Sequence, residues 1–229
     1  MVRKKSDAPG KALMKADKAA VDAAAPYRRT LPVRILSRAS ELGDQPQLMG
    51  IAGGVLALGL IRGDKRLAGA GARMIAAHLI ATAAKNFVKH RIDRTRPRSA
   101  NGKDGHRVKP GRSEAKEETS FPSGHSAGAI AVARAFARDY PEHRAAALGA
   151  AGLIALAQIP RRAHYPTDVG AGVAIGLAAE AAVAALWPVH RDGGSSRGFL
   201  SKAAETKATS RPTGKISMKV MGIRNSGLP

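Results

Sequence analysis

The segment that decides the fold is HYPTDVGAGVAIGLAAEAAVAALW, residues 164–187, in which Pro166 precedes an apolar run that only Glu180 interrupts. Alanine dominates this run and β-branched residues are scattered, a composition that favours helix over strand. Proline fits the first turn of a helix, so we predict that the last helix begins at Pro166. Four other segments are similarly apolar: 48–61, 67–84, 145–159 and, more weakly, 125–136. The sequence therefore predicts an all-α fold, a bundle of about five to six helices.

The same segments favour a polytopic membrane protein. Several are uncharged for most of the thickness of a bilayer, and the charged turn RGDKR at 62–66 joins two of them. None is an uninterrupted run of about 20 apolar residues, the usual length of a membrane span, and the mean hydropathy is −0.19. A soluble, alanine-rich helical bundle is the alternative.

The composition narrows the possible functions. The 229 residues suffice for one domain with tails, and 38 Lys and Arg against 17 Asp and Glu give a net charge of +21. This charge predicts an anionic or phosphorylated partner. The chain has no cysteine, which excludes disulfides, thiolate nucleophiles and zinc–cysteine sites. Aromatic residues make up only 3% of the chain, too few for stacking on single-stranded nucleic acid, so we expect no nucleic-acid partner.

The chain divides into three predicted parts: 1–46, a basic arm followed by an amphipathic interfacial helix; 47–188, the helical bundle; and 189–229, a basic, disordered tail. Within the arm we expect residues 1–30 to be mobile, with at most a fraying helix that ends at Pro26. The amphipathic helix begins near Pro32 and carries Ile35, Leu36, Ala39 and Leu42 on one side. The polar stretch 98–119 is interpreted as a loop or lid.

Three clusters place phosphate-binding residue types beside a proline. The first is KHRIDRTRP, residues 89–97. Lys89 and Arg96 are seven residues apart, so on a helix that ends at Pro97 they lie two turns apart on one face and can bind one anion. A solvated cationic helix end is the alternative.

The second cluster is SFPSGHS, residues 120–126. With Pro122 in the first turn of a helix, the N–H groups of Ser123, Gly124 and His125 point out of the helix N-terminus, where a phosphate binds well. His125 can deliver a proton near neutral pH. The alternative is a helix cap with an incidental histidine.

The third cluster is RRAHYPTD, residues 161–168. Asp168 lies in the first turn of the last helix and His164 just before it. A carboxylate four residues after a histidine can accept its Nδ1 proton and leave Nε2 free to attack an electrophile. Alternatively, Asp168 only stabilises the helix start and His164 is a surface residue.

Together the three clusters resemble the signature of the type 2 phosphatidic acid phosphatase superfamily, which includes lipid phosphate phosphatases, class A acid phosphatases and vanadium haloperoxidases. The family pattern is Lys-x6-Arg-Pro, then Pro-Ser-Gly-His, then Ser-Arg-x5-His-x3-Asp. The first two match at Lys89, Arg96 and Pro97 and at 122–125, and the third matches at His164 and Asp168. The resemblance covers residues 48–187.

The resemblance implies a helical bundle and a metal-independent phosphatase without a cofactor. It implies that His164 attacks phosphorus to form a phosphohistidine, that Asp168 orients His164, and that His125 protonates the leaving group. It also implies phosphoryl-oxygen binding by Lys89, Arg96, Ser123 and Gly124.

One departure concerns the third motif, where Gln158 replaces the family arginine and Ala157 the serine before it. Gln158 can donate a hydrogen bond to the phosphate, and Arg161 or Arg162 can supply the missing charge. Without compensation, the loss of one transition-state donor costs about 10²–10³ in rate, by analogy with oxyanion-hole deletions. A weakened homologue that binds lipid phosphate without turnover is therefore an alternative.

If the five segments all cross a membrane, the three clusters lie on the same side. By family analogy the substrate is then a phosphorylated lipid, and the protein is integral to a bacterial inner membrane. The basic turn 62–66, residues 143–144 and the basic tail favour an outward-facing site by the positive-inside rule, whereas the basic arm argues for the opposite orientation. A soluble acid phosphatase and a haloperoxidase are alternatives with the same residues. The sequence leaves the oligomeric state open.

Overall fold

The computed structural model describes residues 8–100 and 106–188, which belong to one compact unit that extends from Met1 to Val189. The described residues form seven α-helices, three short 3-10 helices and one two-stranded sheet. The prediction of an all-α bundle is therefore confirmed. The predicted basic tail, 189–229, lies outside the described residues.

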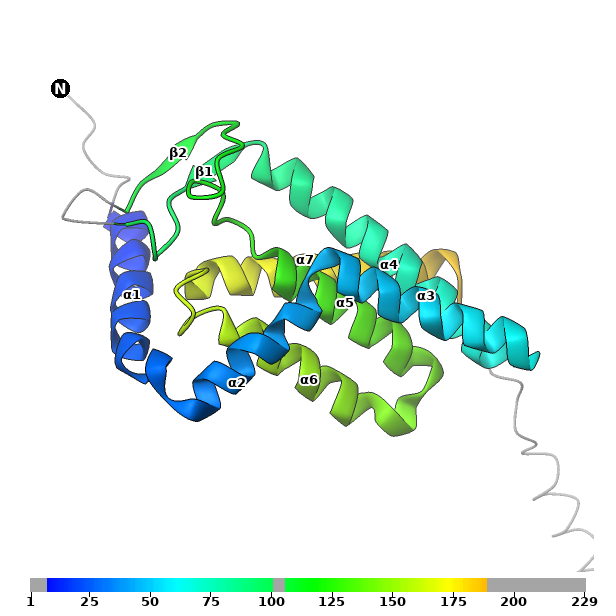
Figure 1. Cartoon of the computed structure of the whole chain (residues 1–229). Helices are drawn as coiled ribbons and strands as arrows, with labels where there is room; N and C mark the ends of the chain where they lie inside the picture. Colours follow the sequence, from blue (N-terminus) through cyan, green and yellow to red (C-terminus); the bar gives the residue numbers. More distant parts are fainter. Residues whose placement is uncertain (1–7, 101–105, 189–229) are drawn as a thin grey trace, which may run out of the picture. The chain divides into compact units, whose positions relative to one another are not determined.

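Five helices lie side by side and form the bundle (Figure 1). They are α3 (Gln45–Arg62), α4 (Lys65–Lys89), α5 (Gly124–Asp139), α6 (Arg144–Ala157) and α7 (Pro166–Leu186). Each matches one predicted apolar segment, and α7 begins at Pro166 as predicted. Helix α5 contacts the other four, so it forms the centre of the bundle.

Small residues allow the central helices to approach closely. The core is largely alanine, and Gly172 and Gly176 of α7 pack directly against the backbone of α5. A Cβ atom at Gly172 would lie 2.4 Å from the Ser123 carbonyl oxygen, and one at Gly176 would lie 2.5 Å from that of Ala127. Such distances exclude any side chain, so these glycines fix the spacing between α5 and α7.

Buried ion pairs join the helices at the end of the bundle where α5 and α7 finish. Glu180 of α7 is almost fully buried and accepts from Nε of Arg134 at 2.8 Å and from Nε of Arg138 at 2.5 Å. Arg73 of α4 forms a two-point ion pair with Asp139 at the end of α5. These pairs tie α4, α5 and α7 together at the end remote from the predicted site residues.

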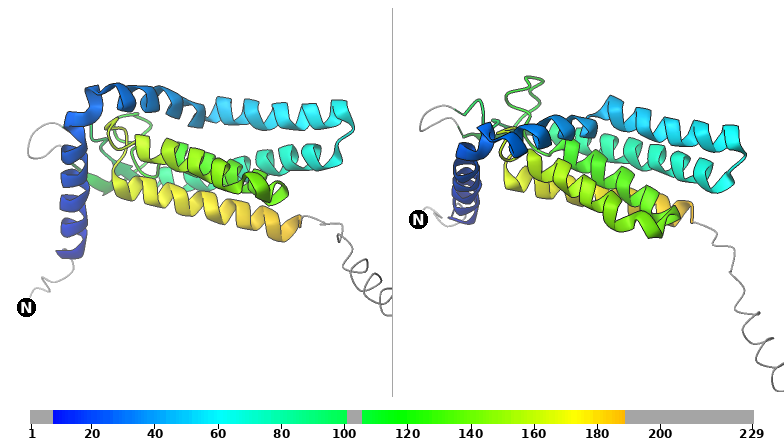
Figure 2. Two further views of the ribbon diagram at one scale, coloured as in Figure 1. Left: turned by 90° about the horizontal axis from the view of Figure 1, so that it is seen from below. Right: turned by 60° about the horizontal axis from the view of Figure 1, so that its bottom comes forward.

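The N-terminal region is folded. It contains α1 (Ala8–Ala24), η1 (Ala25–Arg29), α2 (Leu31–Ala39) and η2 (Ser40–Gly43). Helix α1 runs across one end of the bundle, whereas α2 runs roughly in line with α3 (Figure 2). The helix that was allowed within residues 1–30 is present as α1 and ends at Ala24, before Pro26. Asp17 and Val21 on it are buried, in contrast to the mobile arm that was expected. The predicted amphipathic helix is α2, and its apolar residues Leu31 and Ile35 are exposed.

A β-hairpin replaces the end of the helix that was predicted for 89–97. Helix α4 ends at Lys89, and β1 (Ile92–Arg94) pairs antiparallel with β2 (Val108–Pro110). The residue before a proline is disfavoured in the helical conformation, so Arg96 cannot continue α4 up to Pro97. The hairpin carries the polar stretch 106–119 back to the bundle, where Arg94 N donates to Glu118 O at 2.7 Å and Ser120 N to Arg94 O at 3.0 Å.

Helices α4 and α7 are long and apolar enough to cross a membrane. Of their most apolar windows, 39% and 33% are buried within the described fold. Large apolar side chains are also exposed on the other bundle helices: Leu58, Leu60 and Ile61 on α3, and Leu153 and Leu156 on α6. A bundle with this outer surface is suited to a lipid environment.

Candidate active site

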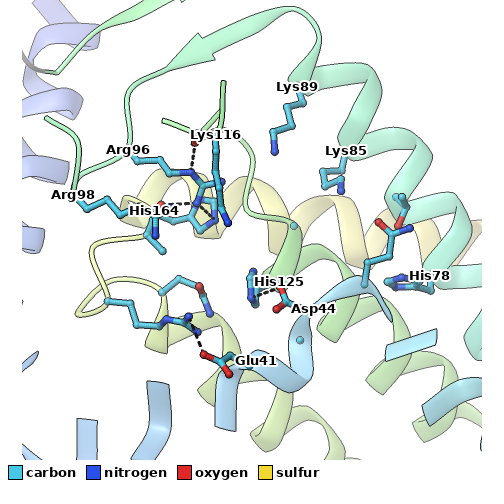
Figure 3. Close-up of a pocket in the computed structure, with 17 residues that line it drawn as sticks. Glu41, Asp44, His78, Lys85, Lys89, Arg96, Arg98, Lys116, His125 and His164 are labelled. Atoms are coloured by element: carbon cyan, nitrogen blue, oxygen red, sulfur yellow. Dashed lines mark hydrogen bonds and ion pairs between the residues drawn. The ribbon is translucent and has the colours of Figure 1, made fainter. Parts of the chain in front are cut away.

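A pocket of about 440 Å³ lies where the ends of the bundle helices meet, with η2 and the start of α3 on one side (Figure 3). The end of α4, the start of α5 and the end of α6 contribute to its wall, together with the loop that leads into α7. The three sequence clusters thus come together at one end of the bundle. This is the arrangement that was predicted from five segments that each cross a membrane.

The pocket is strongly cationic. Six basic side chains line it: Lys85, Lys89, Arg96, Arg98, Lys116 and Arg161. Among the described residues two acidic side chains, Glu41 and Asp44, share the lining. A partly enclosed cavity with this excess of positive charge binds an anion such as a phosphate group.

Seven of the nine predicted site residues line this pocket: Lys89, Arg96, Gly124, His125, Gln158, Arg161 and His164. The other two, Ser123 and Asp168, are fully buried behind the wall. Lys89 and Arg96 meet in the pocket although they do not share a helix, because the hairpin turns Arg96 back toward the bundle.

Arg96 is held in place by backbone carbonyl groups. Its Nε donates to Lys116 O at 2.6 Å, and its two Nη atoms donate to Ala163 O and Thr119 O, both at 3.2 Å. The guanidinium therefore connects the polar stretch to the loop before α7. Its Nη1 also lies 3.5 Å from His164 Nε2, which places a fixed positive charge beside that nitrogen.

His164 is buried with one ring nitrogen directed at a carbonyl group. Its Nδ1 lies 2.7 Å from Ser120 O. A carbonyl oxygen can only accept a hydrogen bond, so Nδ1 carries the proton and Nε2 keeps its lone pair. Burial lowers the pKa of His164, which favours this neutral form. The structure thus provides an imidazole whose unprotonated nitrogen is next to Arg96 in a cationic pocket.

Asp168 does not hold the His164 proton directly, in contrast to the sequence-based expectation. Its Oδ2 is 3.7 Å from His164 Nδ1, beyond hydrogen-bond range. The carboxylate instead accepts from Ser120 Oγ at 2.5 Å, from Tyr165 N at 2.9 Å and from Arg94 Nη1 at 2.6 Å. Because Ser120 binds His164 through its carbonyl and Asp168 through its hydroxyl, it connects the two residues.

Arg94 is a buried link that the sequence analysis did not single out. Its Nη2 donates to Asp17 Oδ2 of α1 at 2.6 Å, and its guanidinium lies over the Tyr165 ring, 4.3 Å from the centroid. Asp17 also accepts from Thr167 N at 3.1 Å. Asp17 and Arg94 therefore form a chain from α1 to Asp168. The spacing of residues gave no signal for Asp17, because its partners are far away in the sequence.

The second histidine, His125, lies on the opposite wall of the pocket from Arg96 (Figure 3). Its Nε2 is 2.9 Å from Asp44 Oδ1. Asp44 immediately precedes α3 and was not predicted as a site residue. The ring faces the pocket with this nitrogen beside a carboxylate, so His125 is placed where it can exchange a proton with a bound ligand.

The predicted phosphate ligands at the start of α5 are only partly available. The Ser123 N–H donates to Asp168 O at 3.0 Å, so it is not directed at the pocket. Helix α5 begins at Gly124, with Ser123 as its N-cap, and Pro122 precedes the helix, contrary to the prediction. The N–H groups of Gly124 and His125 belong to the first turn, where no helical acceptor is in reach.

Gln158 does not replace the missing arginine. It is fully buried, and its Nε2 donates to Ile154 O, one turn back on α6, at 2.9 Å. Arg161 does reach the pocket, where its Nη1 donates to Ser37 O at 2.9 Å and to Ser40 Oγ at 2.5 Å. Arg162 is directed elsewhere, since its Nη2 donates to Pro97 O. Of the two arginines that were considered, only Arg161 contributes charge to this space.

Three further basic residues line the pocket that were not predicted from the sequence: Lys85, Arg98 and Lys116. Lys85 lies one turn before Lys89 on α4 and packs over Gly124, so its spacing of four residues was an available signal. Arg98 and Lys116 come from the polar stretch, whose path depends on the hairpin. Among the described residues, no group of three or more His, Asp or Glu side chains is arranged to hold a metal ion.

The fold and the site together define a helical bundle with an apolar outer surface and a cationic pocket of about 440 Å³, lined by three histidines, His78, His125 and His164. The family comparison agrees: residues 70–192, more than half of the chain, match the model of the PAP2 superfamily. The chain therefore belongs to the PAP2 superfamily, the family that the three motifs predicted.

Two curated relatives are both lipid A 1-phosphatases. The one from Rhizobium etli is 37% identical over 91 residues, which is 40% of this chain and 39% of the relative. The one from Rhizobium johnstonii is 44% identical over 57 residues, 25% of this chain and 23% of the relative. The matched segments thus span less than half of these relatives.

Two solved structures have a similar fold. One is a transmembrane PAP2-type phosphatidylglycerolphosphate phosphatase from Bacillus subtilis, with a TM-score of 0.57 and 20% identity over 80% of this chain and 89% of that one. The other is LpxE from Aquifex aeolicus, with a TM-score of 0.52 and 20% identity over 71% of this chain and 91% of that one.

Proposed function

We propose that the protein is a metal-independent phosphatase that hydrolyses a phosphomonoester or diphosphate of a membrane lipid through a phosphohistidine at His164. The observation that carries this proposal is the state of His164. Its Nδ1 proton is bound by the Ser120 carbonyl, and its unprotonated Nε2 adjoins Arg96 in the cationic pocket. An imidazole in this state is a nucleophile placed where a phosphate binds.

In the proposed first step, His164 Nε2 forms a bond to phosphorus while the bond from phosphorus to the leaving oxygen breaks. His125 gives its proton to that oxygen. In the second step a water molecule attacks phosphorus, the bond to Nε2 breaks, and His125 takes the proton of the water. Both steps need charge neutralisation at the phosphoryl oxygens, which Lys89, Arg96 and the N–H of Gly124 supply.

The surroundings of the pocket support a lipid substrate. The pocket lies at one end of a bundle whose outer surface is apolar. In a membrane this end lies near the headgroups, where the phosphate of a lipid is found. The names of the relatives point in the same direction, since they are phosphatases of phosphorylated lipids. We further propose that the protein is integral to a bacterial inner membrane with the site facing outward.

The first experiment measures phosphate release from a panel of lipid mono- and diphosphates by detergent-purified protein in excess EDTA. We expect release that persists in EDTA and is lost in His164→Ala. A phosphohistidine is labile in acid, so the same samples are denatured at alkaline pH. They should then contain a phosphorylated chain that the variant lacks. Equal phosphate release by both proteins would contradict the role of His164 as the nucleophile.

A second candidate function follows from Gln158, whose amide nitrogen is bound to Ile154 O and whose position carries no charge. A pocket that lacks one transition-state donor is suited to binding a lipid phosphate without turnover. Tight binding of a lipid phosphate together with no release from any member of the panel would favour this function.

A further inference from the structure

His78 is a buried polar side chain that the proposed mechanism does not use. It lies on α4, lines the cationic pocket and is 2% exposed. Among the described residues, neither Nδ1 nor Nε2 of its ring has a hydrogen-bond partner. Buried polar groups in folded proteins are nearly always hydrogen-bonded, because an unpaired one has lost its hydrogen bonds to water without replacement. A partner for His78 must therefore come from what the pocket binds.

Two glycines of α5 make room for the polar face of α4. A Cβ atom at Gly128 would lie 3.0 Å from His78 Cε1 and 3.1 Å from its Nδ1. About one turn earlier on α5, a Cβ atom at Gly124 would lie 3.2 Å from Lys85 Cδ. The His78 ring is therefore packed against α5 and is not free to turn toward solvent.

The α4 wall of the pocket changes from charged to uncharged side chains along its length. Its lining residues follow one face of the helix at spacings of three or four: Lys89, Lys85, Thr82 and His78. The two lysines lie near the end of α4, whereas Figure 3 shows His78 at the end of the pocket remote from Arg96. From Lys85 to His78 the helix advances seven residues, about 10 Å. The inner end of this wall thus offers hydrogen bonds without a lysine or arginine.

A hydroxyl group is the ligand that fits this inner end. A neutral imidazole has one N–H donor and one acceptor nitrogen, and a hydroxyl can pair with either of them. A second phosphate group would accept hydrogen bonds only, and it would lie about 10 Å along the helix from the nearest lysine of this wall. A hydrocarbon chain would leave both ring nitrogens of His78 unpaired, which is unfavourable.

We propose that His78 binds a hydroxyl group of the substrate headgroup while the phosphate occupies the outer, cationic part of the same pocket, an inference that rests on the proposed function. The substrate is then a lipid whose phosphate is attached to a hydroxylated headgroup, a polyol or a sugar, and not directly to a hydrocarbon chain. The hydroxyl is several bonds away from the phosphorus, because His78 lies about 10 Å along the helix from Lys85. His78 is thus a specificity-determining residue.

The test compares alkylphosphonates with ω-hydroxyalkylphosphonates of equal length, from ethyl to octyl. Their carbon–phosphorus bond resists hydrolysis, so binding is measured without turnover. Calorimetry gives the Kd of each compound for the full chain in detergent. At the chain length that reaches His78, we expect the hydroxylated compound to bind about ten-fold more tightly than its partner, the effect of one hydrogen bond to a buried group.

His78→Leu removes both ring nitrogens and should abolish this preference. It should weaken binding of the hydroxylated compound and leave binding of the plain alkyl compound unchanged, whereas a misfolded variant would bind both less well. His78→Gln keeps one donor group and one acceptor and should retain part of the preference. His90→Leu is the matched control, because His90 is exposed directly after α4 and does not line the pocket.

Each outcome decides between the two proposals. A preference for the hydroxyl that His78→Leu removes and His90→Leu keeps supports the inference, whether or not the protein releases phosphate from any lipid. Equal affinity within every pair for the wild-type protein overturns it, and means that water alone satisfies His78. A preference that His78→Leu keeps also overturns it, because another group then binds the hydroxyl. In those last two cases, phosphate release that depends on His164 would leave the proposed function intact.

Discussion

Ser120 contributes to the site through two different groups. Its carbonyl oxygen lies 2.7 Å from His164 Nδ1, and its hydroxyl donates to Asp168 at 2.5 Å. Asp168 is therefore placed to act on His164 through Ser120 and through the field of its charge, rather than by accepting the imidazole proton. The arrangement fixes the ring tautomer with a neutral acceptor, which avoids a strong stabilisation of the protonated imidazole.

The pH dependence of turnover is a prediction at the scale of this one residue. Attack requires unprotonated His164, and burial lowers its pKa below the ordinary 6.5. The neutral form thus persists as the pH falls, and it is lost only when the pH passes the lowered pKa. We expect the acidic limb of kcat/KM that reports His164 to lie below pH 6.5. A profile on a water-soluble phosphomonoester, with stability checked at each pH, measures it. An acidic limb above pH 6.5 would contradict the neutral-nucleophile geometry.

The site residues show what spacing can and cannot predict. His125, His164 and Gly124 reach the pocket because short motifs place them at helix starts, which are local features. Lys89 and Arg96 also reach it, but by a hairpin rather than along one helix. The predictions that failed concern contacts between segments that are distant in the sequence. The Ser123 N–H donates to a carbonyl of α7 and is not available to a phosphate. Asp17 was not predicted, because its partners lie 77 and 150 positions away.

At the scale of elements, α1 is the least expected part of the molecule. Its sequence is rich in lysine and alanine and has no pronounced apolar stripe, which predicts a mobile segment. The structure instead buries Val21 and Asp17 of α1, and the Asp17 carboxylate binds both Arg94 and Thr167. Because Arg94 also binds Asp168, the position of α1 is coupled to the carboxylate next to His164.

Asp17→Asn tests this coupling. The amide keeps the size of the side chain but removes the charge that balances buried Arg94. We expect kcat to fall about 10–100-fold with little change in KM, the range known for carboxylates that orient histidine ligands of metals. Tryptic cleavage within α1 should also become faster, which limited proteolysis detects.

The matched control is Asp22→Asn, on the same helix. Asp22 is exposed and pairs with Lys18 at 3.0 Å. Exposed pairs of this kind contribute little to stability, so both kcat and the cleavage rate should stay at the wild-type level. Equal behaviour of the two variants would show that α1 is not coupled to the site.

At the scale of the whole molecule, the fold was the more predictable part. Alanine-rich, apolar segments form helices wherever they occur, and charged or glycine-containing turns end them. Gly63, for example, ends α3 in the left-handed conformation at φ 66°, inside the predicted turn 62–66. The packing order of the helices was not predictable in this way, because it depends on which glycines meet which backbone.

Membrane association is the prediction at this scale. Leu60 and Ile61 are 67% and 82% exposed, and Leu186 at the end of α7 is 83% exposed. Such surfaces favour lipid over water. We expect the expressed protein to sediment with membranes and to remain there after washing with alkaline carbonate, which immunoblotting measures. Recovery in the wash would instead favour the soluble acid phosphatase.

The link between α1 and α7 has a consequence for biosynthesis. Asp17 leaves the ribosome 150 residues before its partner Thr167, and Asp168 follows that partner directly. Helix α1 must therefore wait until the start of α7 has emerged before it can dock. His164 lies just before α7 as well, so the pocket lacks this histidine until that point of translation. On the proposed function, a nascent chain that has not yet reached α7 therefore lacks its nucleophile.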